Sequence, residues 1–526
     1  MLLPSLQEKQ KTVQSVSDFL GYNHNLVINE NEFYNTKNIT TDLYPVMTQR
    51  NQRGTIRKMN RPNGIFAKGK LCWVDGTDVY YDGNVVGQVT DGKKQFASMG
   101  AYLLIFPDKA MYNTADGTFT KLENIVEITG DIKIEKANMS DSQQNTTEYS
   151  TFAKITAEGI GVGFKQYDGV TISGLPQEDL NKNAIIQELE DDYILIIGDV
   201  KETIETTGTV KVERKVPDME FFTESENRLW GCSSEKHEIY SCKLGDPTNW
   251  YAYEGISTDS YAVTIGSDGD FTGACTYLGY VLFFKEDTIH KIMGNKPSNY
   301  QVTGTKARGV EKGSEQSLII VNETLYYKAR TGIVAYQGAS ATSIAEAFGN
   351  VSYKNAVAGA YGNKYYVSMT DGREYSLFCY DERKGLWCRE DETQMLFTAY
   401  YENMLYYIDS DGNLKSIEGN DEDPIEWEAE SGDIILSYGK KYISRMSIRV
   451  EMEKRSFMDI FVKYDEEKTW ERVKTIRAVN NRNYEVPIRP KRFDHMRVKM
   501  KGTGRCRVYG LEKQFEIGSE VNVRIK

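Results

Sequence analysis

A short unit recurs along this chain: a polar or glycine turn, an aromatic pair, a second turn and another strand-like run. The aromatic pairs are 43, 39 and 41 residues apart and begin at Phe283, Tyr326, Tyr365 and Tyr406. A period of about forty residues built from short strands and tight turns is typical of β-propeller blades. A single blade leaves a wide apolar face, so neighbouring blades must pack together to bury it. The repeat therefore predicts a β-propeller.

The repeat occupies only part of the chain. At 526 residues the chain is too long for one compact core, and we expect about two to four domains. Blade-like segments run over 69–123 and 219–428. Around them we predict an N-terminal arm over 1–68, an inserted small β-barrel or sandwich over 124–218, and a C-terminal β-sandwich over 429–526.

Strand signals support the two additional domains. In the insertion, apolar runs next to glycine turns at 159–164 and 193–198 are typical of strands. Near the C-terminus, apolar and polar residues alternate over 443–452 and 457–464. No segment has a convincing helical period. The sequence therefore predicts an all-β fold: a β-propeller with an inserted small β-domain and a C-terminal β-sandwich.

Charge is distributed unevenly along the chain, whose net charge is −12. Residues 1–68 hold 9 basic and 5 acidic residues, and residues 124–218 hold 9 basic and 18 acidic residues. Residues 429–526 hold 23 basic and 14 acidic residues. An acidic surface repels nucleic acid, whereas a basic one binds an acidic partner or phosphate. The alternative is that both are simply solvated faces.

Cysteine usage and hydropathy indicate where the protein folds. The seven cysteines are odd in number and form no C-x-x-C pair, which favours reduced, buried thiols in a protein that folds in a cytoplasm. A disulfide between Cys379 and Cys388 across a hairpin is the open alternative. No run of 18 apolar residues and no apolar leader is present, so we expect no membrane insertion and no secretion signal.

No motif predicts a metal, a cofactor or a catalytic centre. The glycine-rich run at 159–164 resembles a nucleotide-binding loop, but no helix follows it, and a glycine-rich strand is the better interpretation. The acidic run at 409–413 has oxygen ligands at alternate positions but lacks the distal glutamate of a calcium loop, so a hairpin explains it. The histidines are far apart, and none has a second ligand at zinc-site spacing: His24, His237, His290 and His495.

Sugar-cleaving propellers are the enzymatic alternative. Sialidase-like propellers carry repeated S-x-D-x-G-x-T-W turns, and the nearest match here, at 463–470, occurs once and lacks the serine and the glycine. Retaining hydrolysis also needs a carboxylate nucleophile and an acid in one pocket. Glu286 with Asp287, or Glu390 with Asp391, would be candidates, but solvated turns explain these pairs as well.

Four stretches carry a resemblance to a known family. They read Asn-Arg-Leu-Trp-Gly (227–231), Asp-Pro-Thr-Asn-Trp (246–250), Glu-Thr-Leu-Tyr-Tyr (323–327) and, in the basic end domain, Arg-Val-Lys-Met-Lys (497–501). In these stretches and in the order of its parts, the chain resembles the tail hub or nozzle proteins of short-tailed bacteriophages (podoviruses), also called packaged-DNA stabilisation proteins. The resemblance covers most of the blades and the C-terminus.

The resemblance implies a structural virion protein without enzymatic activity, made in the cytoplasm of a bacterial host. Copies of such a protein, usually six, form a ring below the portal and adaptor proteins. The ring extends the channel for double-stranded DNA, retains the packaged DNA, lets it pass on ejection, and anchors tail fibres or a tail tip. Two alternatives stay open: a glycan-binding or glycan-cleaving propeller of a host-facing fibre, and a neck or tail-tip protein of a long-tailed phage.

The charge distribution is consistent with this implied role as a DNA channel. The remaining repeat region has a net charge of −16, by subtraction from the total. A ring with this negative charge repels phosphate, so a duplex slides through it without sticking. The basic C-terminal domain then has a separate task, and we hypothesise that it docks on acidic faces of adjacent copies or of the adaptor. The residues assigned to this docking are Arg445, Arg449, Arg489, Lys491, Arg492 and Arg497.

Overall fold

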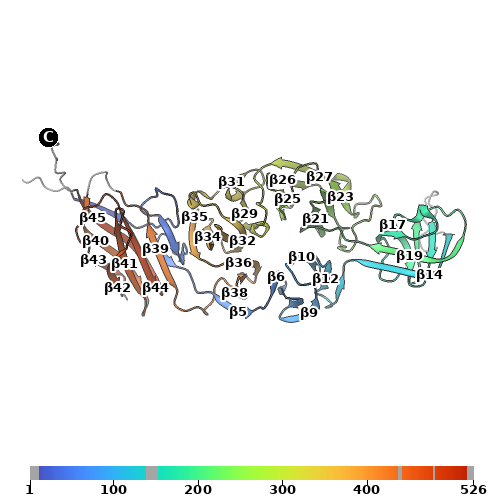
Figure 1. The fold of residues 1–526 in the computed structure, drawn as a ribbon, viewed down its shortest axis with the longest axis horizontal. Helices are drawn as coiled ribbons and strands as arrows, with labels where there is room; N and C mark the ends of the chain where they lie inside the picture. The colour runs from blue at the N-terminus through green and yellow to red at the C-terminus, as the bar shows by residue number, and fades with distance from the viewer. Residues whose placement is uncertain (1–10, 138–151, 436–440, 478–479, 518–526) are drawn as a thin grey trace, which may run out of the picture. The chain divides into compact units, whose positions relative to one another are not determined.

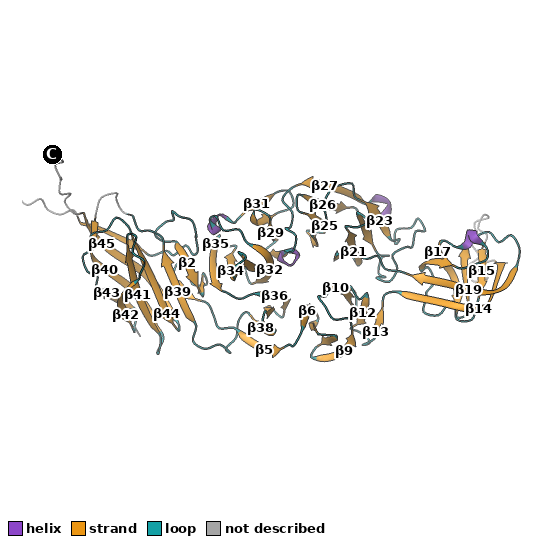
Figure 2. Cartoon of the chain, viewed as in Figure 1, coloured by secondary structure: helices purple, strands orange, loops and turns teal. Residues whose placement is uncertain are grey.

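A computed structural model describes residues 11–137, 152–435, 441–477 and 480–517 of the chain (Figure 1). These residues form strands and turns, and the helical segments among them are 3-10 turns of three residues, such as η2 (Glu178–Leu180) (Figure 2). The all-β prediction is confirmed. The chain forms two compact units, one of residues 1–59 with 313–526 and one of residues 60–312. Among the described residues, no helix is long and apolar enough to cross a membrane.

The unit of residues 60–312 contains four antiparallel sheets of four strands each. The first two sheets are β6 (Pro62–Lys68), β7 (Lys70–Asp75), β8 (Asp78–Tyr81) and β9 (Asn84–Gln88), then β10 (Gln95–Met99), β11 (Tyr102–Phe106), β12 (Ala110–Asn113) and β13 (Phe119–Lys121). The other two are β20 (Phe221–Ser225), β21 (Arg228–Ser233), β22 (Glu238–Ser241) and β23 (Tyr261–Thr264), then β24 (Gly273–Tyr277), β25 (Tyr280–Lys285), β26 (Thr288–Met293) and β27 (Gln301–Lys306).

The other unit contains three more four-stranded sheets. Two are built from consecutive strands: β28 (Ile319–Val321), β29 (Thr324–Ala329), β30 (Gly332–Tyr336) and β31 (Ala341–Ser343), then β32 (Lys354–Tyr361), β33 (Lys364–Thr370), β34 (Tyr375–Asp381) and β35 (Leu386–Asp391). The third joins β36 (Met395–Tyr401), β37 (Met404–Asp409) and β38 (Asn413–Ser416) to β5 (Gly54–Lys58) from the N-terminal region.

The four aromatic pairs of the repeat lie on β25, β29, β33 and β37, each the second strand of its sheet. Successive side chains of a strand point to opposite faces, so a pair such as Tyr326 and Tyr327 on β29 places one ring on each face. Both rings are buried. Tyr326 packs against Tyr365 of the next sheet, with 5.4 Å between ring centroids. The doublet therefore marks a strand that is covered on both sides.

Tight turns set the register of the hairpin formed by the first two strands of a sheet. Asn322 and Glu323 join β28 to β29 with φ of 44° and 66°, and Glu402 and Asn403 join β36 to β37 with φ of 47° and 59°. Two positive φ values are typical of the two-residue turns whose twist matches antiparallel strands. Asparagine tolerates this conformation better than most residues, which explains its recurrence before the aromatic pairs.

The insertion forms a closed barrel, which resolves the predicted choice between barrel and sandwich. Its strands follow the order β14 (Asn124–Ala137), β15 (Phe152–Thr156), β18 (Tyr193–Ile197), β17 (Asn183–Glu190), β16 (Gly169–Ser173) and β19 (Ile204–Arg214). Closure pairs both edges of the sheet and removes exposed strand edges. The interior is filled mainly by isoleucine and valine, including Ile134, Ile155, Ile194 and Val212.

The C-terminal region forms two antiparallel sheets around one core. One sheet contains β1 (Lys11–Val16), β3 (Ile39–Thr40), β4 (Met47–Gln49), β45 (Cys506–Ile517), β40 (Lys441–Met452) and β43 (Arg482–Val486). The other contains β2 (Phe33–Lys37), β39 (Glu426–Ser431), β44 (Met496–Thr503), β41 (Phe457–Tyr464) and β42 (Glu471–Ile476).

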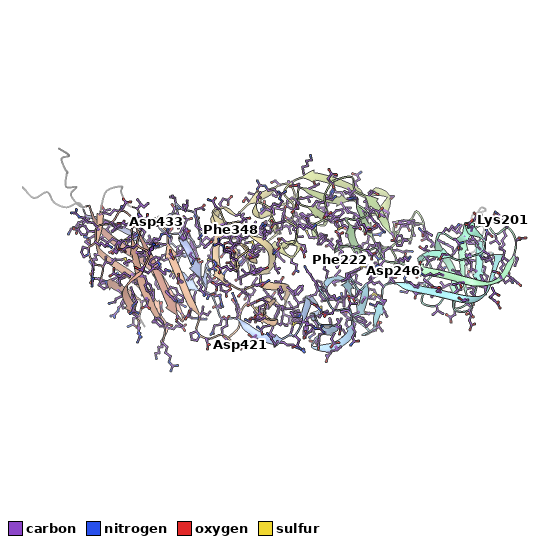
Figure 3. The ribbon with its side chains drawn as sticks, viewed as in Figure 1. Lys201, Phe222, Asp246, Phe348, Asp421 and Asp433 are labelled. Atoms are coloured by element: carbon purple, nitrogen blue, oxygen red, sulfur yellow. The ribbon has the colours of Figure 1, made fainter. Side chains whose placement is uncertain are left out.

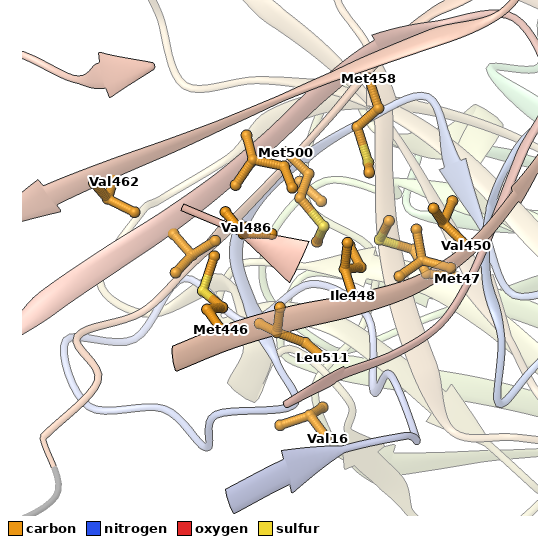
Figure 4. Close-up of a cluster of buried hydrophobic side chains, with 14 of the residues drawn as sticks. Val16, Met47, Met446, Ile448, Val450, Met458, Val462, Val486, Met500 and Leu511 are labelled. Carbon is orange, nitrogen blue, oxygen red and sulfur yellow. The ribbon is translucent and has the colours of Figure 1, made fainter. Parts of the chain in front are cut away.

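This core depends on alternating strands from distant parts of the chain. Every second residue of β41 and β44 is buried, as expected for strands with one face in the core. Met446, Met458 and Met500 from the two sheets meet inside it, together with Val16 and Met47 from the N-terminal region (Figure 4). Each such side chain contributes about 1.5–3 kcal/mol when fully buried.

Strands also occur within residues 1–68, the segment predicted as an N-terminal arm. Strands β1 to β4 join the C-terminal sheets, β5 completes a four-stranded sheet, and β6 begins the first sheet of the other unit. The first four-stranded sheet of that unit thus begins at Pro62, within the segment predicted as an arm. The partner of β5, strand β38, is more than 350 residues away in sequence (Gly54 pairs with Ser416), and no local pattern reveals such a pairing.

Candidate functional site

Two of the six predicted docking residues lie on β40. Arg445 and Arg449 are exposed, and Arg445 Nε lies 3.2 Å from Glu485 Oε1. Arg449 Nε donates a hydrogen bond of 2.9 Å to Asn481 Oδ1. Because β40 pairs with β43, both guanidinium groups lie along the border between these two strands.

Three more docking residues lie in the loop between β43 and β44. Arg489, Lys491 and Arg492 are exposed. Lys491 Nζ pairs with the Glu467 carboxylate and lies 5.1 Å from the centre of the Tyr464 ring. No carboxylate of the described residues lies within 4.0 Å of the other two side chains. Arg489 and Arg492 are therefore available to a partner.

Arg497, the sixth docking residue, is already bound internally. It is half-buried on β44, its Nε donates to Asp433 Oδ1 at 2.6 Å, and its Nη1 lies 3.4 Å from Glu430 Oε1. Its guanidinium also stacks over the Tyr34 ring at 4.7 Å. Burial opposes its charge, but the two carboxylates raise the pKa of Arg497 above its usual value. This residue stabilises the sheet and offers little charge to a partner.

The structure adds basic residues that the docking hypothesis did not include. Strands β42 and β43 are the edge strands of the two C-terminal sheets, and they contact each other. The segment 468–492, which contains both strands, has eight basic and two acidic residues, a local excess that was readable in the sequence. We call its basic side chains the basic edge: Lys468, Arg472, Lys474, Arg477, Arg482, Arg489, Lys491 and Arg492.

The Asp-Pro-Thr-Asn-Trp turn has a structural role. Asp246, labelled in Figure 3, accepts hydrogen bonds from the backbone N–H and the hydroxyl of Thr248. Trp250 is buried, and its ring N–H donates to the Pro247 carbonyl. These bonds fix the loop between β22 and β23 in one conformation.

This loop attaches the barrel to the β20–β23 sheet. Asn249 Nδ2 donates to the Tyr167 carbonyl at 2.7 Å, and the Gly169 N–H donates to Asn249 Oδ1 at 3.2 Å. A Cβ at residue 169 would lie 2.4 Å from the carbonyl carbon of Tyr251, so only glycine fits there. The turn that supported the family resemblance is thus the anchor of the inserted barrel.

The carboxylates considered for sugar cleavage have other roles. Arg53 Nη2 lies 2.7 Å from Glu390 and its Nη1 lies 2.8 Å from Asp391, while Arg50 lies 2.7 Å from Glu422 and 3.5 Å from Asp391. Burial disfavours the charge of Asp391, yet Arg53 and Arg50 hold the pKa of this carboxyl well below its usual range. These groups are counter-ions of a buried cluster, which ties the N-terminal region to β35.

The second carboxylate pair lies in a turn. Glu286 and Asp287 are the two residues between β25 and β26, and a Glu286 carboxylate oxygen accepts a bond of 3.3 Å from the Lys312 backbone N–H. The sialidase-like segment 463–470 connects β41 to β42. The Trp470 ring there lies 4.5 Å from Lys499 Nζ.

The other chemical candidates also have structural explanations. The glycine-rich run at 159–164 forms turns between β15 and β16, so the predicted strand there is wrong. Asp409 accepts hydrogen bonds from the backbone N–H groups of Asp411 and Asn413 and lies 3.1 Å from Lys415 Nζ, as in an ordinary hairpin turn. The described part of the chain contains no cluster of three potential metal ligands.

The cysteines are free thiols, including the pair considered as a disulfide. Cys379 and Cys388 are register partners on β34 and β35. Burial raises the pKa of Cys388 to about 12, so its thiol stays protonated at neutral pH.

Comparison with known proteins gives only distant similarities. No family model and no curated protein matches the chain. Among solved structures, BamB from Moraxella catarrhalis is 10% identical with a TM-score of 0.31, covering 78% of this chain and 99% of BamB. Phage phi92 endosialidase is 11% identical with a TM-score of 0.23, covering 90% of this chain and 76% of the endosialidase. Exo-β-1,3-galactanase from Phanerochaete chrysosporium is 9% identical with a TM-score of 0.23, covering 54% of this chain and 92% of the galactanase. Similarities this weak assign no function to the chain.

Proposed function

We propose that the seven four-stranded sheets are blades of one β-propeller and that the paired C-terminal sheets form a β-sandwich. The support is the pairing of β5 with β38, in which an N-terminal strand completes a sheet built from the end of the repeat. In a closed ring of blades, such a strand joins the segment before the repeat to its last sheet, so this sheet has four strands like the others.

On this scaffold we propose a structural role in a virion: the hub or nozzle ring of a short-tailed phage tail. Several copies, six by family resemblance, would surround the DNA channel below the portal and adaptor proteins and anchor fibres or a tail tip. The observation that carries this proposal is the use of the candidate catalytic carboxylates as counter-ions. Glu390 and Asp391 are neutralised by Arg50 and Arg53 in a buried cluster, which leaves no nucleophile and acid pair there.

The test uses the purified full-length chain. Negative-stain microscopy and mass photometry should find rings with one copy number, either with the chain alone or after a portal–adaptor ring is added. A chain that stays monomeric in both conditions and releases reducing sugar from complex glycans would refute the proposal in favour of the fibre enzyme. Rings that add to the tube of a long-tailed virion would favour the neck or tail-tip alternative.

A further inference from the structure

In the described residues of the segment that carries the basic edge, 468–477 and 480–492, no large apolar side chain is exposed. Trp470, Val473 and Tyr484 are half-buried against the sheets. Protein-binding surfaces place apolar and aromatic side chains at their centre, whereas nucleic-acid-binding surfaces are polar and strongly positive. The composition of the basic edge therefore favours a polyanion over a folded protein.

Most cations of the basic edge are also unpaired. Arg472 lies 3.8 Å from Asp459, and Lys491 pairs with Glu467. Within the part of the chain that the structure describes, no carboxylate lies within 4.0 Å of the remaining cations. These are Lys468, Lys474, Arg477, Arg482, Arg489 and Arg492. Their charge is thus not cancelled locally and can act on a ligand.

The spacing of these cations suits a phosphate backbone. Arg477 and Arg482 flank the connection between β42 and β43, and Arg489 and Arg492 follow the opposite end of β43. The five residues of β43 span about 17 Å at 3.3 Å per residue. Each strand of a DNA duplex places a phosphate about every 3.4 Å along the axis, so this length matches about five base pairs, or half a helical turn. Guanidinium groups bind phosphate oxygens in a bidentate way.

We propose that the basic edge binds the sugar-phosphate backbone of double-stranded DNA without reading its bases. The contact holds a duplex against the C-terminal sheets through charge, in contrast to the net-negative insertion over 124–218, which repels it. This binding goes beyond the proposed channel role, because it is a direct contact of a named surface with DNA, and it does not depend on ring assembly. Charged side chains on edge strands also prevent strand pairing between copies of a protein. The test must therefore separate binding of DNA from prevention of self-association.

The test measures the affinity of the full-length chain for labelled duplexes of two unrelated sequences by fluorescence anisotropy at several salt concentrations. Wild type should bind both alike, with affinity falling steeply as salt rises. Replacing Arg477, Arg482, Arg489 and Arg492 together by Gln should weaken binding at least about tenfold and flatten the salt dependence by up to about 3.6 in log–log slope, or 0.9 for each lost phosphate contact. Lysine at the same positions should retain most of the affinity.

A matched control removes the same charge elsewhere. Lys296, Lys306, Arg373 and Arg383 are exposed and lie outside the basic edge, and their joint change to Gln should alter affinity by less than about twofold. An equal loss in this control would overturn the proposal, since it would reduce the effect to net charge. Absence of duplex binding by the wild type at low salt would overturn it as well.

Two further measurements cover misfolding of the Gln variant and the alternative that these cations bind a protein partner. If the Gln variant aggregates on size exclusion, hydrogen exchange of the wild type replaces it: bound duplex should slow exchange in β42 and β43, and unchanged exchange there would refute the site. Charge reversal of Arg489, Lys491 and Arg492 to Glu addresses the docking hypothesis. Lost ring assembly with unchanged duplex binding would assign these cations to a protein partner and overturn our proposal.

Discussion

Two charged regions of the same unit use arginine in opposite ways. At the junction of the N-terminal region with β35, Arg50 and Arg53 are buried and bound by three carboxylates. Along the basic edge, arginines such as Arg477 and Arg489 are exposed and carry no carboxylate partner among the described residues. The residue type is the same, so burial and pairing decide whether the charge stabilises the fold or is available to a ligand.

The difference follows from the cost of desolvation. A buried guanidinium without a partner loses several kcal/mol of hydration, so it persists only with counter-ions in good geometry. An exposed guanidinium keeps its water, and losing it changes stability by a few tenths of a kcal/mol. Predictions that remove charge or packing from each region should therefore differ most in their effect on folding.

The largest expected effect is that of Arg53→Ala. The substitution removes one of the two arginines that pair with Glu390 and Asp391, which remain buried. The free energy of unfolding should therefore fall by about 3–5 kcal/mol. Urea unfolding should shift to lower concentration, and hydrogen exchange should accelerate first in β5 and β35. Arg61→Ala is the control, because Arg61 pairs with Asp91 on the surface and its loss should cost no more than about 1 kcal/mol. Similar costs for both variants would show that burial of an arginine–carboxylate pair does not decide how much the pair stabilises the fold.

A purely steric change at the barrel anchor should rank second. In Gly169→Ala the new methyl group meets the Tyr251 carbonyl, and we expect a loss of about 1–3 kcal/mol with faster exchange around residues 249–252. Gly130→Ala on β14 is the matched control, since no atom lies within 4 Å of its added Cβ. If the two variants are equally stable, Asn249 and Tyr251 do not anchor the barrel.

A buried neutral base should give a smaller, pH-dependent effect. His290 is buried, its Nε2 bonds Ser267 Oγ at 2.9 Å, and burial together with the nearby charge of Lys285 lowers the pKa of His290 to about 4. The unfolded chain binds this proton near pH 6.5, so the contribution is complete above pH 6.5 and is lost as pH falls toward 4. We expect a loss of about 2 kcal/mol by pH 4.5. The thermal midpoint of His290→Gln should fall less between pH 7 and pH 4.5 than that of wild type; parallel curves would refute this assignment.

The smallest effect on stability is expected at the basic edge. The joint change of Arg477, Arg482, Arg489 and Arg492 to Gln should alter the free energy of unfolding by less than about 0.5 kcal/mol per residue. Thermal unfolding of the variant beside wild type checks this. A large loss would show that these arginines support the fold, as Arg53 does, and would weaken the contrast between the regions.

The sequence was most informative where structure is local. The aromatic pairs that begin at Tyr326 and Tyr365 predicted the strands and the repeat of about forty residues. Side-chain alternation and turn conformation depend on neighbours in sequence, so such a pattern is readable locally. It was least informative for residues 1–68, whose strands pair with partners near the other end of the chain. For the candidate surface, the sequence located a basic domain. It assigned the same docking role to Arg497 and Arg489, although Arg497 pairs with two carboxylates and Arg489 has no carboxylate partner among the described residues.

By itself, the sequence determined that the chain is built from short antiparallel strands and that its C-terminal region is basic. Both properties follow from the order and type of neighbouring residues. Only the tertiary structure decided that β5 completes the sheet of β38, that Gly169 meets Tyr251, and which arginines are buried with counter-ions and which lie on an open edge. Those outcomes depend on contacts between residues tens to hundreds of positions apart, where the balance of packing and desolvation is set by the fold and not by local pattern.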